Sequence, residues 1–253
     1  GIIVKNLTEY KNSLICNPMS ESYLFSNEEC EQITNSLLEI KNLWQHRNGT
    51  MFFSVGALSY LDKGYDYIDN INRYNLILSN KFMWVYDKIQ QYFQKNIEKT
   101  VTYGTNNLHT KAFPGFHIFQ NAKILNQNKW GASIHTDSPE LKHAWESEVL
   151  EIFTFTISVK SPIRKSGLRF WMDTESWEDE YESPIYYDEC SSDMKKLLEE
   201  TALYVTYKTG HIYEHTGDVY HQIATEENFN IGEMRITLQG HLVELEDVIV
   251  IYV

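Results

Sequence analysis

The segment WGASIHTD, residues 130–137, contains the pattern from which the rest of this 253-residue sequence can be interpreted. It holds a His-x-Asp pair, and in an extended segment residues two apart point the same way. His135 and Asp137 can therefore reach one metal ion together, while Thr136 faces elsewhere. A third ligand must come from a distant part of the chain that the fold brings alongside.

Two later segments complete the pattern, GDVYHQI at 217–223 and MRITL at 234–238. Two imidazoles and one carboxylate, here with His221 as the second imidazole, occupy one triangular face of an octahedral ferrous ion and leave three positions open. Arg235 follows after a tight turn and a return strand, and its planar guanidinium binds a carboxylate with two hydrogen bonds. Thr237 shares the face of Arg235 and can add a hydroxyl donor.

This order of residues resembles the Fe(II)/2-oxoglutarate-dependent oxygenase superfamily, whose pattern is His-x-Asp, a distant His, then Arg-x-Ser/Thr. The resemblance implies that His135, Asp137 and His221 are the ligands of Fe(2+). It also implies that Arg235, together with Thr237, binds the far carboxylate of 2-oxoglutarate, with O2 as co-substrate. The expected enzyme is a 2-oxoglutarate-dependent dioxygenase.

Three more segments look like parts of the same superfamily: FSNEEC at 25–30, SGLRFW at 166–171 and KTGHIY at 208–213. The resemblance covers about residues 22–45 and 115–245. His211 and His215 are rivals for the third ligand position. His215 lies too far before Arg235 for the spacing of the superfamily, which favours His221.

The resemblance also indicates the reaction. Related radical halogenases have Gly or Ala where this chain has Asp137, so hydroxylation of an unactivated C–H bond is expected rather than halogenation, with desaturation and ring formation as open alternatives. AlkB-like nucleic-acid demethylases carry a second Arg at the position of His241, and prolyl hydroxylases mostly have Lys at that of Arg235. The layout is more similar to members that act on small molecules, namely free amino acids or natural-product intermediates.

Three alternatives remain open at this stage. Within the enzyme class, a protein side chain is the rival substrate. Outside it, the chain is a non-enzymatic jelly-roll binding module whose metal-type residues are incidental. A cupin-type metal enzyme without 2-oxoglutarate is the third alternative, and it leaves Arg235 without a role.

Composition restricts the partners and the compartment. The 35 acidic and 22 basic residues give a formal net charge of −13, which repels phosphate backbones, so no nucleic-acid partner is expected. The apolar C-terminal segment is far too short to span a membrane, and no membrane partner is expected. Cys16, Cys30 and Cys190 are scattered, and no signal peptide is evident, so we expect a cytoplasmic protein without disulfides.

The pattern of elements predicts the fold class. A capping box at Ser26 and Glu29 opens an amphipathic helix over 27–44, and an aromatic stripe predicts another over 80–95. Residues 62–72 are expected to form a polar loop, residues 140–149 a short helix and residues 191–200 another helix. Expected strands are 51–58, 117–125, 152–160, 168–173, 204–207, 210–214, 233–243 and 247–253.

Helices that precede a strand-rich half fit an α+β double-stranded β-helix, a jelly roll with the N-terminal helices packed on one sheet. We expect a single oxygenase domain over 1–253. In it, residues 1–114 give helical and strand support, and 115–253 form the jelly-roll core with an acidic insertion at about 173–200.

Substrate contacts are predicted from one strand and from the insertion. Arg169 and Trp171 share a face, so an inward orientation would let Arg169 hold a substrate carboxylate and Trp171 form a pocket wall. The alternative is an outward Arg packed over a surface Trp. The acidic insertion can form a lid that attracts a basic amino acid such as lysine or arginine, or a solvated flap. Either His117 or Asn121 is expected to line the cofactor pocket.

Overall fold

The structure is a computed structural model, and it describes residues 2–14, 19–47, 52–105, 111–120, 130, 132–137, 145–162, 166–177, 184–225 and 232–253. Its helices are α1 (Leu7–Ser13), α2 (Asn27–Glu39), α3 (Tyr65–Asn96) and α7 (Ser192–Thr201), with short 3-10 turns at Lys41–Leu43 and Tyr187–Glu189. Its first strands are β1 (Met19–Tyr23), β2 (Gln45–Arg47), β3 (Phe52–Val55), β4 (Val101–Tyr103), β5 (Gly115–Phe119) and β6 (Glu151–Lys160). The others are β7 (Ser166–Trp171), β8 (Leu203–Thr206), β9 (His211–Thr216), β10 (Tyr220–Thr225), β11 (Arg235–Glu244) and β12 (Ile249–Tyr252).

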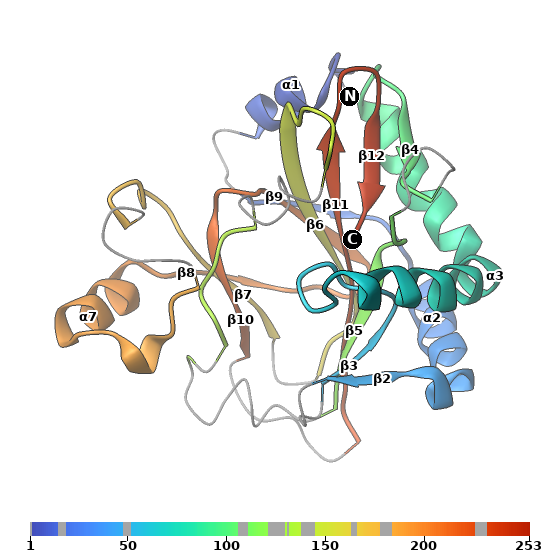
Figure 1. Cartoon of the computed structure of the whole chain (residues 1–253). Coiled ribbons are helices and arrows are strands. Elements are labelled where there is room, and N and C mark those ends of the chain that lie inside the picture. The colour runs from blue at the N-terminus through green and yellow to red at the C-terminus, as the bar shows by residue number, and fades with distance from the viewer. Residues whose placement is uncertain are drawn as a thin grey trace.

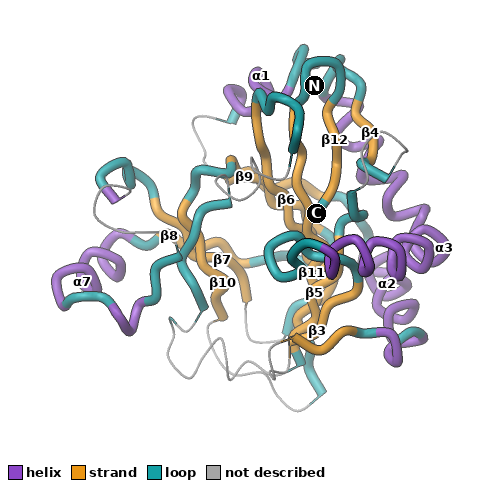
Figure 2. Tube along the Cα trace, viewed as in Figure 1, coloured by secondary structure: helices purple, strands orange, loops and turns teal. Residues whose placement is uncertain are grey.

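Two sheets form the centre of the described molecule (Figures 1 and 2). The larger has nine strands and contains the path β1-β9-β6-β11-β5-β3-β2, with β12 and β4 attached beside β11. The smaller has three strands in the order β10-β7-β8. From β5 onward the chain enters the larger sheet at β6, the smaller at β7 and β8, the larger at β9, the smaller at β10 and the larger at β11. This alternation between antiparallel sheets is consistent with the expected jelly roll.

The larger sheet has one apolar and one polar face. On β6, Phe153 and Phe155 belong to the main hydrophobic core, whereas the alternating Thr154, Thr156 and Ser158 point to the other side. All five side chains are buried. The apolar face is covered by α1, α2 and α3. In Figure 1, α2 and α3 lie on the opposite side of the molecule from α7, and α1 lies at the top. The polar face is turned toward the smaller sheet and carries the candidate site.

The start of α2 agrees with the sequence prediction, whereas its end comes earlier than expected. Ser26 and Glu29 form the predicted capping box at the start of α2, and the helix ends at Glu39, before the 3-10 turn that replaces the last part of the expected helix. Gly210 permits the close approach between this region and the turn before β9. Its φ is 85°, and a Cβ there would lie 2.0 Å from the backbone oxygen of Phe25.

The long helix α3 corrects one expectation. Residues 62–72 were expected to be a polar loop, but one helix runs over Tyr65–Asn96, with a break in helical geometry at Phe82. Ile71, Tyr74 and Leu78 are buried and extend the apolar stripe of the expected 80–95 helix toward the N-terminus. The prediction was wrong because the polar residues between them form the solvent-facing side of the same helix.

The acidic insertion forms a layer on the smaller sheet. Trp171, Trp177, Ile185, Met194 and Leu198 make a separate hydrophobic core beneath α7, and the Trp171 indole Nε1 donates to the Leu198 oxygen at 3.0 Å. The described part of 173–200 therefore packs on the face of that sheet where Trp171 lies. Residues 178–183 and 140–144, the first half of the expected 140–149 helix, lie outside the described residues, and 145–149 do not form a helix.

For the described residues, the structure also bears on the expectations about the membrane and about the cysteines. None of the helices among these residues has the length and apolar character that crossing a lipid bilayer requires. Cys30 and Cys190 are free thiols, and Cys16 lies outside the described residues.

Candidate metal centre

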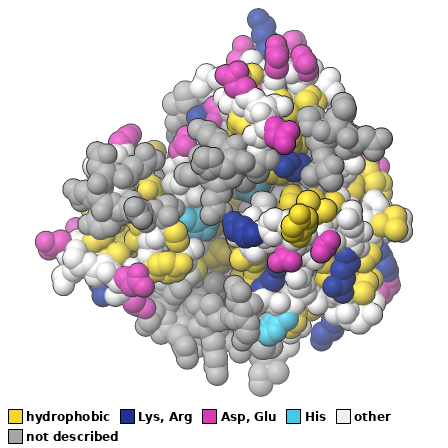
Figure 3. Space-filling model, viewed as in Figure 1, with side chains coloured by type: hydrophobic (Ala, Val, Ile, Leu, Met, Phe, Trp, Pro, Cys, Tyr) yellow, Lys and Arg dark blue, Asp and Glu magenta, His cyan; other side chains and the backbone are white. Residues whose placement is uncertain are grey.

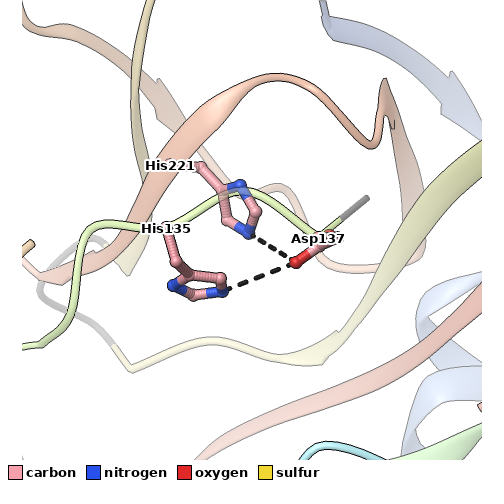
Figure 4. A group of neighbouring side chains, drawn as sticks. All are labelled: His135, Asp137 and His221. Carbon is pink, nitrogen blue, oxygen red and sulfur yellow. Dashed lines mark ion pairs between the residues drawn. The ribbon is translucent and has the colours of Figure 1, made fainter. Parts of the chain in front are cut away.

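The backbone brings the three predicted ligands together (Figure 4). The His135 amide donates to the His221 oxygen at 3.1 Å, and the His221 amide donates to the His135 oxygen at 3.0 Å. Side chains of residues paired in this reciprocal way point to the same side of a sheet. The Asp137 amide donates to the Gly217 oxygen at 2.9 Å, which keeps the segment beside the turn before β10.

The distances between the ligand atoms fit neighbouring positions around one ion. Asp137 Oδ1 lies 3.5 Å from Nε2 of His135 and 3.5 Å from Nε2 of His221, and the three ligand atoms all lie within 4.8 Å of one another. Ligand atoms at right angles on bonds of about 2.1 Å lie about 3 Å apart, and opposite ligand atoms lie about 4.2 Å apart. The Asp–His distances are closer to the first value, as a facial arrangement requires.

Hydrogen bonds leave the correct ring nitrogens for a metal. The Nδ1 atom of His221 lies 2.8 Å from the Val219 oxygen, and Nδ1 of His135 lies 3.3 Å from the Ser133 oxygen. A carbonyl oxygen only accepts, so these contacts favour the tautomers with the proton on Nδ1. The lone pairs of both Nε2 atoms are then directed at Asp137.

Asp137 is itself held by a side-chain relay. The Thr154 hydroxyl donates to Asp137 Oδ2 at 2.9 Å, which leaves Oδ1 for a metal ion. Because that hydroxyl proton is used, the contact of 3.0 Å between Thr154 Oγ1 and His241 Nδ1 is a hydrogen bond donated by the imidazole. His241 thereby supports the orientation of Asp137 through Thr154.

Charges around the site favour the protonation states that a metal requires. Burial alone would raise the pKa of Asp137, but the imidazoles of His221, His135, His241 and His215 together hold it below its usual value. Burial lowers the pKa of His221, against the opposing charge of Asp137. An ionised carboxylate and a neutral imidazole are the forms that bind metal ions.

Arg235 lies on the same inner face as the metal centre, at the start of β11. It is 1% exposed, and among the described residues none hydrogen-bonds to its Nε, Nη1 or Nη2 atom. The guanidinium carbon instead lies 5.7 Å from the ring centroid of Phe119 and 5.4 Å from that of Tyr207. Burial lowers the pKa of Arg235, but a guanidinium remains charged at neutral pH. A buried cation with three unpaired nitrogens fits a bound carboxylate.

Thr237 and His117 lie beside this guanidinium. Thr237 is fully buried, accepts a hydrogen bond from Gln239 Nε2 at 3.0 Å and pairs with His117 of β5. Burial and the charge of Arg235 lower the pKa of His117 to about 3, so this imidazole is neutral at neutral pH. Its Nε2 atom lies 2.6 Å from the Tyr60 hydroxyl. Asn121, the other residue expected to line the pocket, lies outside the described residues.

The substrate role predicted for Arg169 and Trp171 does not agree with the strand register. His221 pairs with Phe170, so Arg169 and Trp171 point to the opposite face of the smaller sheet from the metal centre. Trp171 is buried under α7, and the Arg169 guanidinium lies 4.1 Å from the ring centroid of Trp130. An outward Arg packed over a Trp was the alternative interpretation, and the Trp it covers is Trp130 rather than Trp171.

The rival histidines occupy other places. His215 is buried with its ring centroid 4.7 Å from that of His221, and its Nδ1 atom lies 2.8 Å from the Thr216 oxygen. It lies beside the metal group, which consists of His135, Asp137 and His221. His211 instead lies 3.0 Å from Glu21 Oε1.

Sequence reasoning missed Thr154 and the contacts of Phe119 and Tyr207 with Arg235. The usable signal was the alternation of Thr and Ser with apolar residues along 153–159, because hydroxyl side chains inside a fully buried strand need polar partners.

Figure 3 shows the surface of the molecule from the same side as Figure 1. This surface is hollowed near its centre, with histidine side chains visible at the hollow.

Comparison with known proteins places the chain by its fold. No protein-family model matches the sequence, and no curated protein matches it. The N-substituted L-amino acid dioxygenase from Burkholderia ambifaria AMMD is similar in structure, with 8% sequence identity, a TM-score of 0.52, and 98% of this chain and 92% of that chain covered. Its complex with alpha-KG gives a TM-score of 0.51 at the same identity and coverage.

HygX from Streptomyces hygroscopicus, with nickel and 2-oxoglutarate bound, has 10% identity over 93% of this chain and 87% of that chain, but its TM-score of 0.42 is too low to bear on the fold. The likeness to the Burkholderia enzyme extends over nearly the whole of both chains. The chain therefore has the fold of that dioxygenase, in agreement with the fold that the sequence resemblance predicted.

Proposed function

We propose that this chain is an Fe(II)- and 2-oxoglutarate-dependent oxygenase that hydroxylates an unactivated C–H bond of a small molecule. The observation that carries the proposal is the buried guanidinium of Arg235, without a hydrogen-bond partner among the described residues, on the same inner face as a facial group of two imidazoles and a carboxylate. A binding module gains nothing from a costly unpaired buried charge. A cupin-type enzyme without 2-oxoglutarate likewise has no use for it.

The residues present fit both groups. His135, Asp137 and His221 would hold the iron, and Arg235 with Thr237 would hold the far carboxylate of 2-oxoglutarate. Iron and 2-oxoglutarate, when bound with O2, supply the oxidising chemistry for converting C–H to C–OH. The residues of the chain would orient the substrate and the cofactors and exclude water from the site.

The two aromatic rings beside Arg235 support the proposed role of its guanidinium. Phe119 and Tyr207 keep the Arg235 guanidinium in a dry environment, where its attraction for a carboxylate is stronger than in water. Asp137 fills the position that radical halogenases leave open for chloride, which supports hydroxylation over halogenation. The alternation of strands between the two sheets supports a double-stranded β-helix with one oxygenase domain.

An amino acid or a natural-product intermediate is the proposed substrate class. The Burkholderia enzyme of similar fold is named for N-substituted L-amino acids, and this supports a small molecule over a protein side chain. The formal net charge of −13 supports a basic amino acid, because an acidic protein attracts cations and repels anions. Substrate-dependent succinate release with lysine, arginine and neutral or acidic amino acids tests this choice.

The test of the proposed function is an anaerobic titration of metal-free protein with Fe(II) and then 2-oxoglutarate. We expect the visible charge-transfer band of the chelate, and we expect it to be lost in Asp137→Ala and in Arg235→Met. Arg73→Met and His46→Ala change exposed residues away from the site and are the matched controls. Absence of the band in folded wild-type protein would refute the proposal and leave a jelly-roll binding module as the better description.

A further inference from the structure

The side chain of Gln222 makes three hydrogen bonds although it is fully buried. Its Nε2 atom donates to the Trp130 oxygen at 2.9 Å and to the Ala132 oxygen at 2.6 Å. Its Oε1 atom accepts from Arg169 Nη1 at 2.6 Å. Both amide protons are thus used on the segment that precedes the first metal ligand, His135.

This side chain extends the hydrogen bonding between residues 130–137 and β10 beyond the backbone bonds of the described residues. The segment is joined to β10 by the two reciprocal bonds between His135 and His221, and to the preceding turn by the Asp137 amide. Farther toward its N-terminus, the carbonyls of Trp130 and Ala132 accept from the Gln222 amide rather than from the backbone of β10. Gln222 therefore fixes the approach of the segment from the strand position next to His221.

Arg169 fixes Gln222 in turn. Its hydrogen bond orients the Gln222 amide so that the oxygen faces the guanidinium and the nitrogen faces the two carbonyls. The same guanidinium lies over the ring of Trp130 at 4.1 Å, and Trp130 stacks on Tyr187 with ring centroids 5.0 Å apart and planes at 17°. The Lys195 ammonium lies 5.4 Å from the ring centroid of Tyr187. Tyr187 and Lys195 of the acidic insertion thereby pack at Trp130, at the start of the segment that leads to His135.

We propose that Gln222, oriented by Arg169, is a positioning residue that holds the His135–Asp137 segment against the strand of His221 and so sets the geometry of the metal centre. The inference rests on the proposed function, because it names residues that act on the iron ligands without touching the metal. Arg169 acts on the reaction through Gln222 and Trp130, rather than by the substrate contact that its sequence position first indicated.

The decisive variant is Gln222→Met, which keeps the length of the side chain and removes all three hydrogen bonds. Gln94→Met is the matched control, since Gln94 Nε2 also donates to two backbone oxygens, those of Ile97 and Lys99, and its Oε1 accepts from the Val101 amide. Each variant loses one amide that makes three hydrogen bonds, but Gln94 is half-buried and lies at the end of α3, away from the metal centre.

Two readouts are measured on each protein. The first is the dissociation constant for Fe(II) under argon, which we expect to rise 10–100-fold in Gln222→Met and to stay unchanged in Gln94→Met, as for other residues that orient metal ligands. The second is hydrogen exchange in the metal-free protein. We expect the amides of His135 and Asp137 to exchange at least tenfold faster in Gln222→Met only.

Each outcome decides something. Equal Fe(II) affinity and equal exchange in wild type and Gln222→Met would overturn the inference while leaving the proposed function intact. Failure of the wild type to bind Fe(II) would refute the proposed function, and the exchange comparison would still decide whether Gln222 holds the segment. If Gln222→Met does not fold, Gln222→Glu replaces it, because a carboxylate still accepts from Arg169 but cannot donate to the carbonyls. Wild-type exchange in Gln222→Glu would overturn the inference.

Discussion

Replacing Arg235 with Met should make the metal-free protein more stable and remove its response to 2-oxoglutarate. The guanidinium is 1% exposed and has no hydrogen-bond partner among the described residues. Met is similar in length, is apolar and adapts to irregular spaces. The substitution therefore removes a buried charge while leaving the space between Phe119 and Tyr207 largely filled.

The expected gain in stability follows from two opposing contributions. A buried ion without hydrogen bonds costs several kcal/mol. The two aromatic rings return about 1–2 kcal/mol in total, because both lie near the outer limit of about 6 Å for a cation–π contact. The net gain on removing the charge is about 1–3 kcal/mol. At roughly 2–4 °C per kcal/mol for a chain of this size, the Tm of the metal-free protein should rise by about 2–12 °C.

The Tm shift produced by 2-oxoglutarate should, in contrast, be smaller in Arg235→Met than in the wild type. At a concentration of about 100 times the Kd, a ligand stabilises the folded state by about 2.7 kcal/mol, which corresponds to about 5–10 °C for the wild type. Losing one partner of a buried charged hydrogen-bond pair costs about 2–5 kcal/mol, or at least about 30-fold in affinity. At the same concentration, 2-oxoglutarate should therefore stabilise Arg235→Met by about 0.9 kcal/mol or less, which corresponds to a Tm shift of about 3 °C or less.

Differential scanning fluorimetry of the metal-free protein, and of the protein with Mn(II) in the absence and presence of 2-oxoglutarate, measures both effects. Arg73→Met, in which an exposed arginine is changed, should behave as the wild type. Arg235→Lys should keep the charge and lose the bidentate fork, and so give an intermediate shift with 2-oxoglutarate. A less stable metal-free Arg235→Met protein with a full 2-oxoglutarate shift would refute the reasoning, since the guanidinium would then have a structural partner and no ligand.

Three further predictions concern the carboxylates and the metal. Thr154→Val removes the hydroxyl that orients Asp137, so the Kd for Fe(II) should rise about 10–100-fold, while Thr34→Val, which removes another buried hydroxyl, should leave it unchanged in the same titration. Burial raises the pKa of Glu214 above its ordinary value of 4.5, so the folded state holds this proton more tightly than the unfolded state, and stabilisation by this group is lost as the pH rises through the raised pKa. Urea unfolding should show that Glu214→Gln gains stability relative to wild type as the pH rises above 4.5, and a difference independent of pH would contradict this. Removing the metal with EDTA should abolish the Tm shift by 2-oxoglutarate in wild-type protein, and a shift that persists would show that 2-oxoglutarate binds without iron.

Local sequence determined the ligand set and most of the elements. His135 and Asp137 are two residues apart in an extended segment, and this spacing alone places both side chains on one side. The capping box at Ser26 and Glu29 specified the start of α2 in the same local way. Such features depend on a few neighbouring residues, so they can be predicted without knowledge of the tertiary contacts.

The same local reasoning was wrong where burial depends on a distant partner. Residues 62–72 carry enough polar groups to suggest a loop, but Asp62 forms a buried bidentate pair with Arg47, and Ile71 and Tyr74 pack into the core. The sequence gives no indication that β2 will lie beside this segment. Only the assembled sheet decided which residues of α3 are covered.

The face of a strand is likewise a tertiary property. Alternation showed that Arg169 and Trp171 share a face, but not that β7 would pair with β10 in the register that puts His221 opposite Phe170. A shift by one residue would have turned both side chains toward the metal.

What the sequence alone determined was the chemistry of the candidate metal ligands and of the arginine proposed to bind a carboxylate, because their identities and order are written in the chain. The tertiary structure decided which groups stay unpaired, which hold the ligands from behind and which face solvent. These properties depend on contacts between strands far apart in the sequence, as in the pairing of Thr154 with Asp137 and of Gln222 with Ala132.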